Sequence, residues 1–188
     1  MSTPAAKFFV NQGVVSSRAD MLHLLRPLLK QTVTYRYLRG REVISHGTGW
    51  VERIVVDADD ISTYFTPLAI TLNIDSFEHL EFETRPDQLL VYALVQGDER
   101  VVVERLLNDA RRQAAAGQIE ESIKTAQRAR KIAEASSAVL RDDPAVTVAA
   151  ADELLRELYT LQGELPSLNP VAAAPPMPRP TVPPSRAT

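Results

Sequence analysis

The sequence has 188 residues, of which 45% are hydrophobic and 24% are charged, and its formal net charge is −3 at pH 7. This composition is that of a globular protein and excludes collagen-like chains, wholly disordered chains and basic nucleic-acid-binding arms. The absence of cysteine excludes disulfides, zinc–thiolate sites, iron–sulfur clusters and thiol nucleophiles.

The N-terminus carries no signal peptide that we can identify. The stretch from Met1 to Val10 lacks the apolar segment of a secretory signal. No apolar run in the sequence approaches the roughly 18–20 residues that a membrane-spanning helix needs. We therefore expect a cytoplasmic protein with no membrane partner, and we expect residues 1–17 to form a flexible arm.

Residues 18–105 predict a small β-rich domain that opens with one short helix. Ser17 and Asp20 form a capping-box pattern, apolar residues follow at helical spacing, and Pro27 is expected to end or kink the helix. Strands are predicted over 33–38 and 42–56. The second is either one interrupted strand or two, with a β-bulge expected at Gly47-Thr48-Gly49.

The clearest alternation of apolar and polar residues runs from Leu68 to Glu83. It predicts a half-buried antiparallel strand pair with a break near Asp75-Ser76. Residues 88–95 are apolar on both faces, which predicts a central strand. Residues 101–105 fit either a last strand or the start of a helix, and their three consecutive valines favour the strand.

Residues 106–165 predict a helical annex, either a helical hairpin or three helices. Apolar residues recur there at helical spacing, and Gly117 and Gly163 are natural helix ends. Residues 166–188 hold eight of the 13 prolines and predict a disordered Pro-rich tail. Within it, Pro175-Pro176-Met177-Pro178-Arg179 has the form of a Pro-x-x-Pro ligand for an aromatic groove.

The fold class that follows is α+β, with a small bent antiparallel sheet or barrel between the short helix and the annex. A short helix followed by about five bent strands resembles the Sm-like family of small barrels, and this resemblance implies RNA binding. Residues 103–129 also resemble part of one tetratricopeptide repeat. The match covers the small-residue and Gly-turn positions, Ala110, Gly117, Ile119, Ile123 and Ala129. No second copy follows, so a generic helical hairpin is preferred.

The favoured function is a non-catalytic protein–protein interaction or assembly protein, such as an adaptor. The sequence has no catalytic motif, its helices carry alanine stripes suited to close helix contacts, and its strands offer edges for pairing. We expect a protein partner or a homo-oligomer, and no cofactor. The predicted interface residues are Leu154, Leu158 and Leu161 on a helix and Trp50 on the sheet.

A first alternative is an Sm-like module that binds single-stranded nucleic acid. Basic and aromatic side chains interleave there in a pattern suited to base stacking: Tyr35, Arg36, Tyr37, Arg39 and Arg41. Nucleic acid is not the favoured partner, because residues 1–106 carry 11 basic and 14 acidic residues.

A second alternative is a metal-dependent enzyme. His79, Glu81 and Glu83 alternate on one face of a predicted strand, with Asp75 nearby and His46 as a possible further ligand. Imidazole and carboxylate groups in this spacing suit a divalent metal. The polar face of an antiparallel strand is the simpler interpretation.

Overall fold

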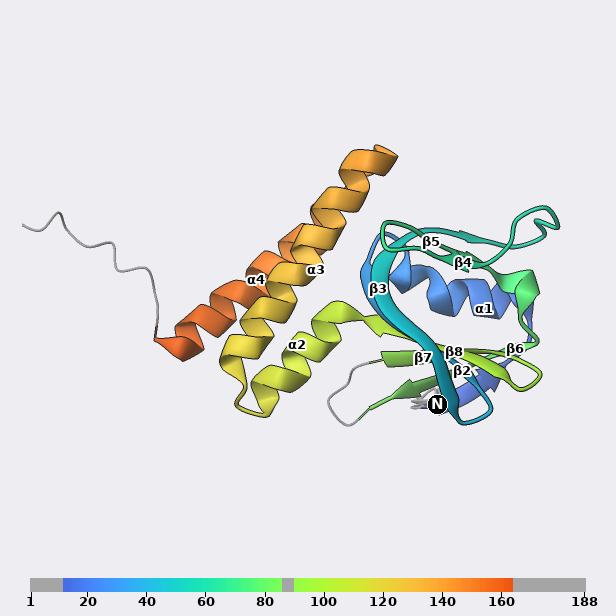
Figure 1. The fold of residues 1–188 in the computed structure, drawn as a ribbon, viewed down its shortest axis with the longest axis horizontal. Helices are drawn as coiled ribbons and strands as arrows, with labels where there is room; N and C mark the ends of the chain where they lie inside the picture. The colour runs from blue at the N-terminus through green and yellow to red at the C-terminus, as the bar shows by residue number, and fades with distance from the viewer. Residues whose placement is uncertain (1–11, 86–89, 164–188) are drawn as a thin grey trace, which may run out of the picture.

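The computed structural model describes residues 12–85 and 90–163 (Figure 1). The predicted Pro-rich tail and the first eleven residues of the predicted arm lie outside these ranges. The strands are β1 (Gln12–Val15), β2 (Thr32–Arg39), β3 (Glu42–Val55), β4 (Tyr64–Phe65), β5 (Ile70–Asn73), β6 (His79–Thr84), β7 (Leu90–Gln96) and β8 (Glu99–Arg105). The helices are α1 (Arg18–Leu25), α2 (Leu106–Ala115), α3 (Ile119–Leu140) and α4 (Ala145–Gln162), with short 3-10 helices η1 (Arg26–Leu28) and η2 (Ile74–Ser76). The α+β class is confirmed.

The predicted N-terminal helix forms where its capping signal lies. The hydroxyl oxygen of Ser17 accepts a hydrogen bond from the backbone N–H of Asp20 at 3.5 Å, at the start of α1. Pro27 lies in η1, and the α-helix ends at Leu25 just before it. Residues 12–15, which the sequence assigns to a flexible arm, instead form β1 and pair with β6.

The sheet is mixed and open, whereas the sequence predicted an antiparallel sheet or a barrel. The strand order is β1-β6-β7-β8-β2-β3-β5-β4, and β1 and β4 are its two edges. Every pairing is antiparallel except that between β3 and β5, which is parallel. The parallel pair arises because the chain crosses back through residues 56–69 before β5 begins, and parallel strands require such a crossover.

Strand β3 is a single strand of 14 residues, without the predicted interruption. The bulge falls at Ile44, since Tyr37 pairs with Ser45 while the next residue of β2 pairs with Val43. Gly47 instead allows a close approach of side chains. A Cβ atom at that position would lie 2.9 Å from the hydroxyl oxygen of Tyr35.

The break predicted near residue 75 is confirmed by η2, which separates β5 from β6. The predicted solvent face of β5 is, however, buried. The amide nitrogen of Asn73 donates to the backbone carbonyls of Ala58 and Ile61, at 3.0 and 2.6 Å. Polar residues of β5 therefore face a loop of the same chain rather than water. The strands predicted at the centre of the sheet and over residues 101–105 are confirmed as β7 and β8.

The annex consists of three helices, which is the second of the two predicted alternatives. The alanine stripe of α3, Ala126, Ala129 and Ala133, is fully buried, which allows neighbouring elements to approach its backbone closely. Gly117 and Gly163 follow α2 and α4 with φ of +79° and +75°, a left-handed conformation that favours glycine. No helix in the two described ranges is long and apolar enough to span a membrane.

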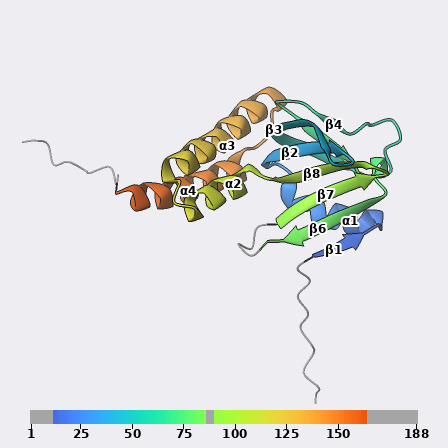
Figure 2. The same ribbon diagram turned by 60° about the horizontal axis from the view of Figure 1, so that its bottom comes forward.

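Different elements pack on the two faces of the sheet (Figure 2). Directly opposed residues of antiparallel strands share a face. On the inner face, Val33 and Val103 join an apolar core with Met21, Leu25 and Leu28 of α1 and η1.

On the outer face, one end of the sheet is covered by the annex. The hydroxyl of Thr32 donates to the carbonyl of Ala129 in α3 at 2.9 Å, and the guanidinium of Arg112 in α2 donates two 2.8 Å bonds to Glu104 of β8. The annex is thus fixed to the sheet. The inner face remains accessible beyond the α1 core.

Candidate functional site

An open cleft of about 720 Å³ lies on the inner face of the sheet, near the β2–β3 hairpin. We call it the inner cleft. Its floor is formed by side chains of β2, β7 and β8: Tyr35, Tyr37, Leu94, Gln96, Glu99 and Val101. Its wall is formed by the segment before and within β4 and by the end of β5 with η2: Asp59, Ile61, Ser62, Thr63, Tyr64, Phe65, Asn73, Asp75, Ser76 and Phe77.

Aromatic rings from distant parts of the chain meet in the inner cleft. The ring centroids of Tyr35 on the floor and Phe65 in the wall are 4.5 Å apart, with the planes tilted by 36°. The hydroxyl of Tyr37, which is itself part of the floor, donates to the carboxylate of Glu99 at 2.7 Å, and this hydrogen bond fixes the position of the ring. Tyr64 at the rim is 38% exposed. The cleft therefore presents apolar ring surfaces with polar groups at its margin.

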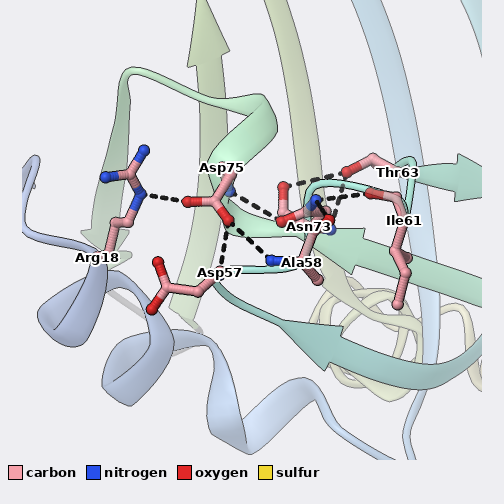
Figure 3. Close-up of polar contacts among 7 residues, drawn as sticks. All are labelled: Arg18, Asp57, Ala58, Ile61, Thr63, Asn73 and Asp75. Carbon is pink, nitrogen blue, oxygen red and sulfur yellow. Dashed lines mark hydrogen bonds and ion pairs between the residues drawn. The ribbon is translucent and has the colours of Figure 1, made fainter.

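The wall of the cleft is fixed by side chains from the end of β5 and from η2 (Figure 3). One carboxylate oxygen of Asp75 accepts the backbone N–H of Asp57 at 2.6 Å and that of Ala58 at 3.4 Å. Arg18 of α1 forms an ion pair with the other oxygen. Asp57 has a φ of +55°, a conformation that a non-glycine residue adopts at some cost. This network holds the loop from residue 57 onward against the sheet.

The inner cleft has no free cation among its described lining residues. Glu99 is compensated by Arg39, whose guanidinium lies 3.0 Å from the same carboxylate oxygen that Tyr37 contacts. These two hydrogen bonds, from Tyr37 and then Arg39, lower the pKa of Glu99. The only arginine of the lining, Arg100, directs its guanidinium to Glu81 on the outer face. Asp59 forms no ion pair within the part of the chain that the structure describes.

The predicted nucleic-acid residues do not form one surface. Tyr35, Tyr37 and Arg39 lie on the inner face, whereas Arg36 between them points to the outer face, because successive strand residues alternate. Arg41 lies in the exposed turn after β2. The two tyrosines line the inner cleft, but the arginines are divided among three places.

Three of the four predicted interface residues are covered by their own chain. Leu154 and Leu158 are buried in the apolar core of the annex. Trp50 has 0% exposure on the outer face, under the annex, and its indole N–H donates to Asp142. Leu161, near the end of α4, is 69% exposed. The apolar stripe of α4 faces the other helices, so only Leu161 is accessible to a partner.

The predicted metal ligands are dispersed. The imidazole of His79 lies 3.5 Å from Glu81, which is paired with Arg100. Asp75 holds the cleft wall, and His46 lies on β3, which is separated from β6 by the three strands β7, β8 and β2. Within residues 12–85 and 90–163, no three His, Asp or Glu residues come together in a way that could hold a metal ion.

The sequence analysis singled out Tyr35 and Tyr37 of the cleft floor, as nucleic-acid residues, and gave no role to Tyr64 and Phe65 of the wall. Tyr64 and Phe65 are the only aromatic pair in an otherwise polar stretch, and this is a signal that the sequence did carry. Family models, curated proteins and solved structures offer no match to the chain. The assignment of a function therefore depends on the geometry of the cleft.

Proposed function

We propose that the protein is a non-catalytic protein–protein interaction module that binds an extended polypeptide segment in the inner cleft. The observation that carries this proposal is the group of aromatic rings on the inner face, with Tyr35 against Phe65 and Tyr64 at the rim. Aromatic-lined grooves bind extended peptides through ring contacts to their side chains and hydrogen bonds to their backbone. Tyrosine is also enriched among residues that dominate binding energy at interfaces.

Charge supports a polypeptide over a nucleic acid as the ligand. A phosphate backbone requires several uncompensated lysines or arginines. The described lining of the cleft holds the carboxylates of Asp59, Asp75 and Glu99, and its single arginine is engaged by Glu81. A neutral or basic peptide fits this balance better than RNA does.

The polar groups of the cleft support binding rather than catalysis. Its described lining contains no histidine or lysine, and two of its three carboxylates, Asp75 and Glu99, are engaged by arginines. The hydroxyl of Thr63 is occupied by the backbone of Asn73 and by the hydroxyl of Ser76, at 2.8 and 3.1 Å. These hydroxyls fix the wall of the cleft and have no activating partner.

The proposal is tested by selecting peptides from a random 12-residue display library on the immobilised full chain. Dissociation constants are then measured for the selected peptides with Tyr64→Ala and with Leu161→Ala, two exposed apolar positions on the sheet and on the annex. We expect Tyr64→Ala to weaken binding about tenfold, as for an aromatic interface residue worth more than 1 kcal/mol. We expect Leu161→Ala to leave binding unchanged.

Two outcomes would overturn the proposal. One is a library that yields no peptide above background on a folded chain. The other is a set of peptides that lose affinity with Leu161→Ala and keep it with Tyr64→Ala. The second result would move the interaction surface to α4. Far-UV circular dichroism of both variants checks that each remains folded.

A further inference from the structure

A Pro-rich segment of the same chain has the chemistry that the inner cleft would bind. Residues 175–186 read Pro-Pro-Met-Pro-Arg-Pro-Thr-Val-Pro-Pro-Ser-Arg, with six prolines, two arginines and no acidic residue. The segment lies outside the described residues. We infer that it is the ligand of the inner cleft of its own molecule, an inference that rests on the proposed function.

The composition of the segment matches the lining of the cleft. A proline-rich chain is extended before it binds, forms no internal hydrogen bonds and docks on grooves lined by aromatic rings. Tyr35, Tyr37 and Tyr64 supply such rings. The positive charges of Arg179 and Arg186 complement a cleft in which, among the described lining residues, the uncompensated charge is the carboxylate of Asp59.

Asp59 is the best placed of these carboxylates for an arginine of the segment. It lies in the cleft wall, is exposed, and forms no ion pair with any residue of the described ranges. Asp75 and Glu99 are already paired with arginines. A guanidinium at Asp59 would form a charge-assisted hydrogen bond, which is among the stronger polar contacts.

The chain is long enough to connect the end of α4 to the cleft. The hydroxyl of Thr147 in α4 donates to the carbonyl of Lys30 just before β2 at 2.8 Å. The distances to Gly163 at the end of α4 and to Tyr37 in the cleft can therefore both be measured from this contact. Gly163 lies ~24 Å from there at 1.5 Å per helical residue, and Tyr37 lies ~23 Å away at 3.3 Å per strand residue. With about 8 Å more for the hydrogen-bonded link between the Cα atoms of Thr147 and Lys30, Gly163 and Tyr37 are no more than about 55 Å apart.

A polyproline segment rises 3.1 Å per residue. At that rise, the chain would span ~37 Å from Gly163 to Pro175, ~50 Å to Arg179 and ~71 Å to Arg186. The length to Arg186 exceeds the largest separation that the fold allows, so the C-terminal end of the segment can reach Tyr37 without any change in the folded part.

The test uses a spin label on the full chain. Because the chain has no cysteine, Thr181→Cys provides a single site for a nitroxide. In a ¹⁵N-labelled sample we expect the amide signals of residues 59–65 to lose more than half of their intensity. Those of β1, at the opposite edge of the sheet, should keep theirs. The matched control carries the same label with Pro175, Pro176, Pro178 and Pro180 replaced by Ala, which should restore the signals.

A second sample separates the chain's own segment from that of another copy. It mixes spin-labelled, isotopically unlabelled chain with unmodified ¹⁵N chain. Broadening of residues 59–65 in this mixture would overturn the inference, because the ¹⁵N chains carry no spin label and the bound segment would then belong to a second molecule. Broadening that is equal with and without the proline substitutions would also overturn it.

Different experimental results would contradict the inference and the proposed function. If library peptides bind the inner cleft while the spin label leaves residues 59–65 unchanged, the proposed function stands and the segment is not its ligand. If both hold, the proline substitutions should tighten the binding of library peptides about tenfold, because a tethered competitor has been removed.

Discussion

The indole nitrogen of Trp50 donates a hydrogen bond to the carboxylate of Asp142 across 3.3 Å. This contact joins β3, the longest strand of the sheet, to the loop between α3 and α4. The strand and the loop are far apart in the sequence. Lys30, just before β2, forms an ion pair with the same carboxylate oxygen and donates to the carbonyl of Glu52 at 2.9 Å. Sheet and annex are thus connected at a point where an aromatic ring, a cation and a carboxylate meet.

Trp50 should be among the most destabilising positions in the chain to truncate. Replacing Trp50 with Ala removes a fully buried ring, and we expect the free energy of unfolding to fall by about 3–5 kcal/mol. Trp50→Phe keeps most of the packing and loses the N–H donor, so a loss of about 1–2 kcal/mol is expected. Urea unfolding followed by far-UV circular dichroism measures both. A loss below 1 kcal/mol for Trp50→Ala would show that the annex does not seal this position.

The contacts of Asp142 with Lys30 and Trp50 should contribute a part of the protein's stability that is lost in acid. Burial raises the pKa of Asp142, but hydrogen bonds from Lys30, Trp50 and the backbone of Asp143 together outweigh it, so the pKa lies below its ordinary value. The stabilisation is therefore present above the unfolded-state pKa of about 3.9 and is lost as the pH falls through the folded-state pKa.

Asp142→Asn removes this charge and keeps an oxygen that can accept from Trp50. We expect a loss of about 1 kcal/mol at pH 7 and a smaller loss at pH 3, which lies below the unfolded-state pKa of about 3.9, because part of the wild-type stabilisation is already absent there. Urea unfolding at the two pH values measures the difference. An equal loss at both would show that the charge of Asp142 contributes nothing.

The contact between Arg112 and Glu104 should contribute more to the free energy of unfolding than any exposed ion pair does. Glu104 is 8% exposed, and both guanidinium bonds to it are 2.8 Å long. These bonds raise the pKa of Arg112 further above its ordinary value, despite its partial burial. Arg112→Ala leaves a nearly buried carboxylate without a partner, for which we expect a loss of about 3 kcal/mol.

The matched control is Arg130→Ala. Arg130 pairs with Glu134 and Asp152 on the surface of the annex, and its removal should cost less than about 1 kcal/mol. Both variants are compared by thermal and urea unfolding. Equal losses would mean that burial of Glu104 adds nothing to its pairing.

The two glycines of β3 should respond differently to alanine. A Cβ at Gly49 would lie 2.9 Å from the backbone carbonyl oxygen of Thr66, which cannot move independently, so we expect Gly49→Ala to cost about 2 kcal/mol. A Cβ at Gly47 meets only the ring of Tyr35, which can tilt. Gly47→Ala should leave stability nearly unchanged and weaken peptide binding in the inner cleft. Unfolding and peptide titrations of both variants test this, and the reverse order would contradict it.

Local signals in the sequence were sufficient for much of the fold. The cap at Ser17, the stop at Pro27 and the helix ends at Gly117 and Gly163 each depend on a few adjacent residues, and the structure has them where they were expected. The parallel pairing of β5 was not predicted, because it depends on where a long crossover returns. Asn73 was assigned to a solvent face because its polarity does not reveal that a loop will cover it.

The candidate site was predictable only in part, because contacts between distant segments of the chain leave no local pattern in the sequence. Tyr35 and Tyr37 share a strand, so their common face follows from periodicity. Phe65 meets Tyr35 only through the tertiary fold, which no periodicity encodes. An apolar stripe such as that of Leu158 shows that a face will be buried, but not whether the cover belongs to the same chain.

The position of the annex after the sheet in the chain has a consequence for synthesis. Trp50 is made early, and the residue that accepts its hydrogen bond follows 92 residues later. At the usual rate of translation this interval lasts roughly 5–18 s. All eight strands leave the ribosome while one end of the outer face still lacks its helices. A nascent chain at that stage exposes the largest ring of the protein, and we expect chaperones that hold apolar segments to bind it there until α3 emerges.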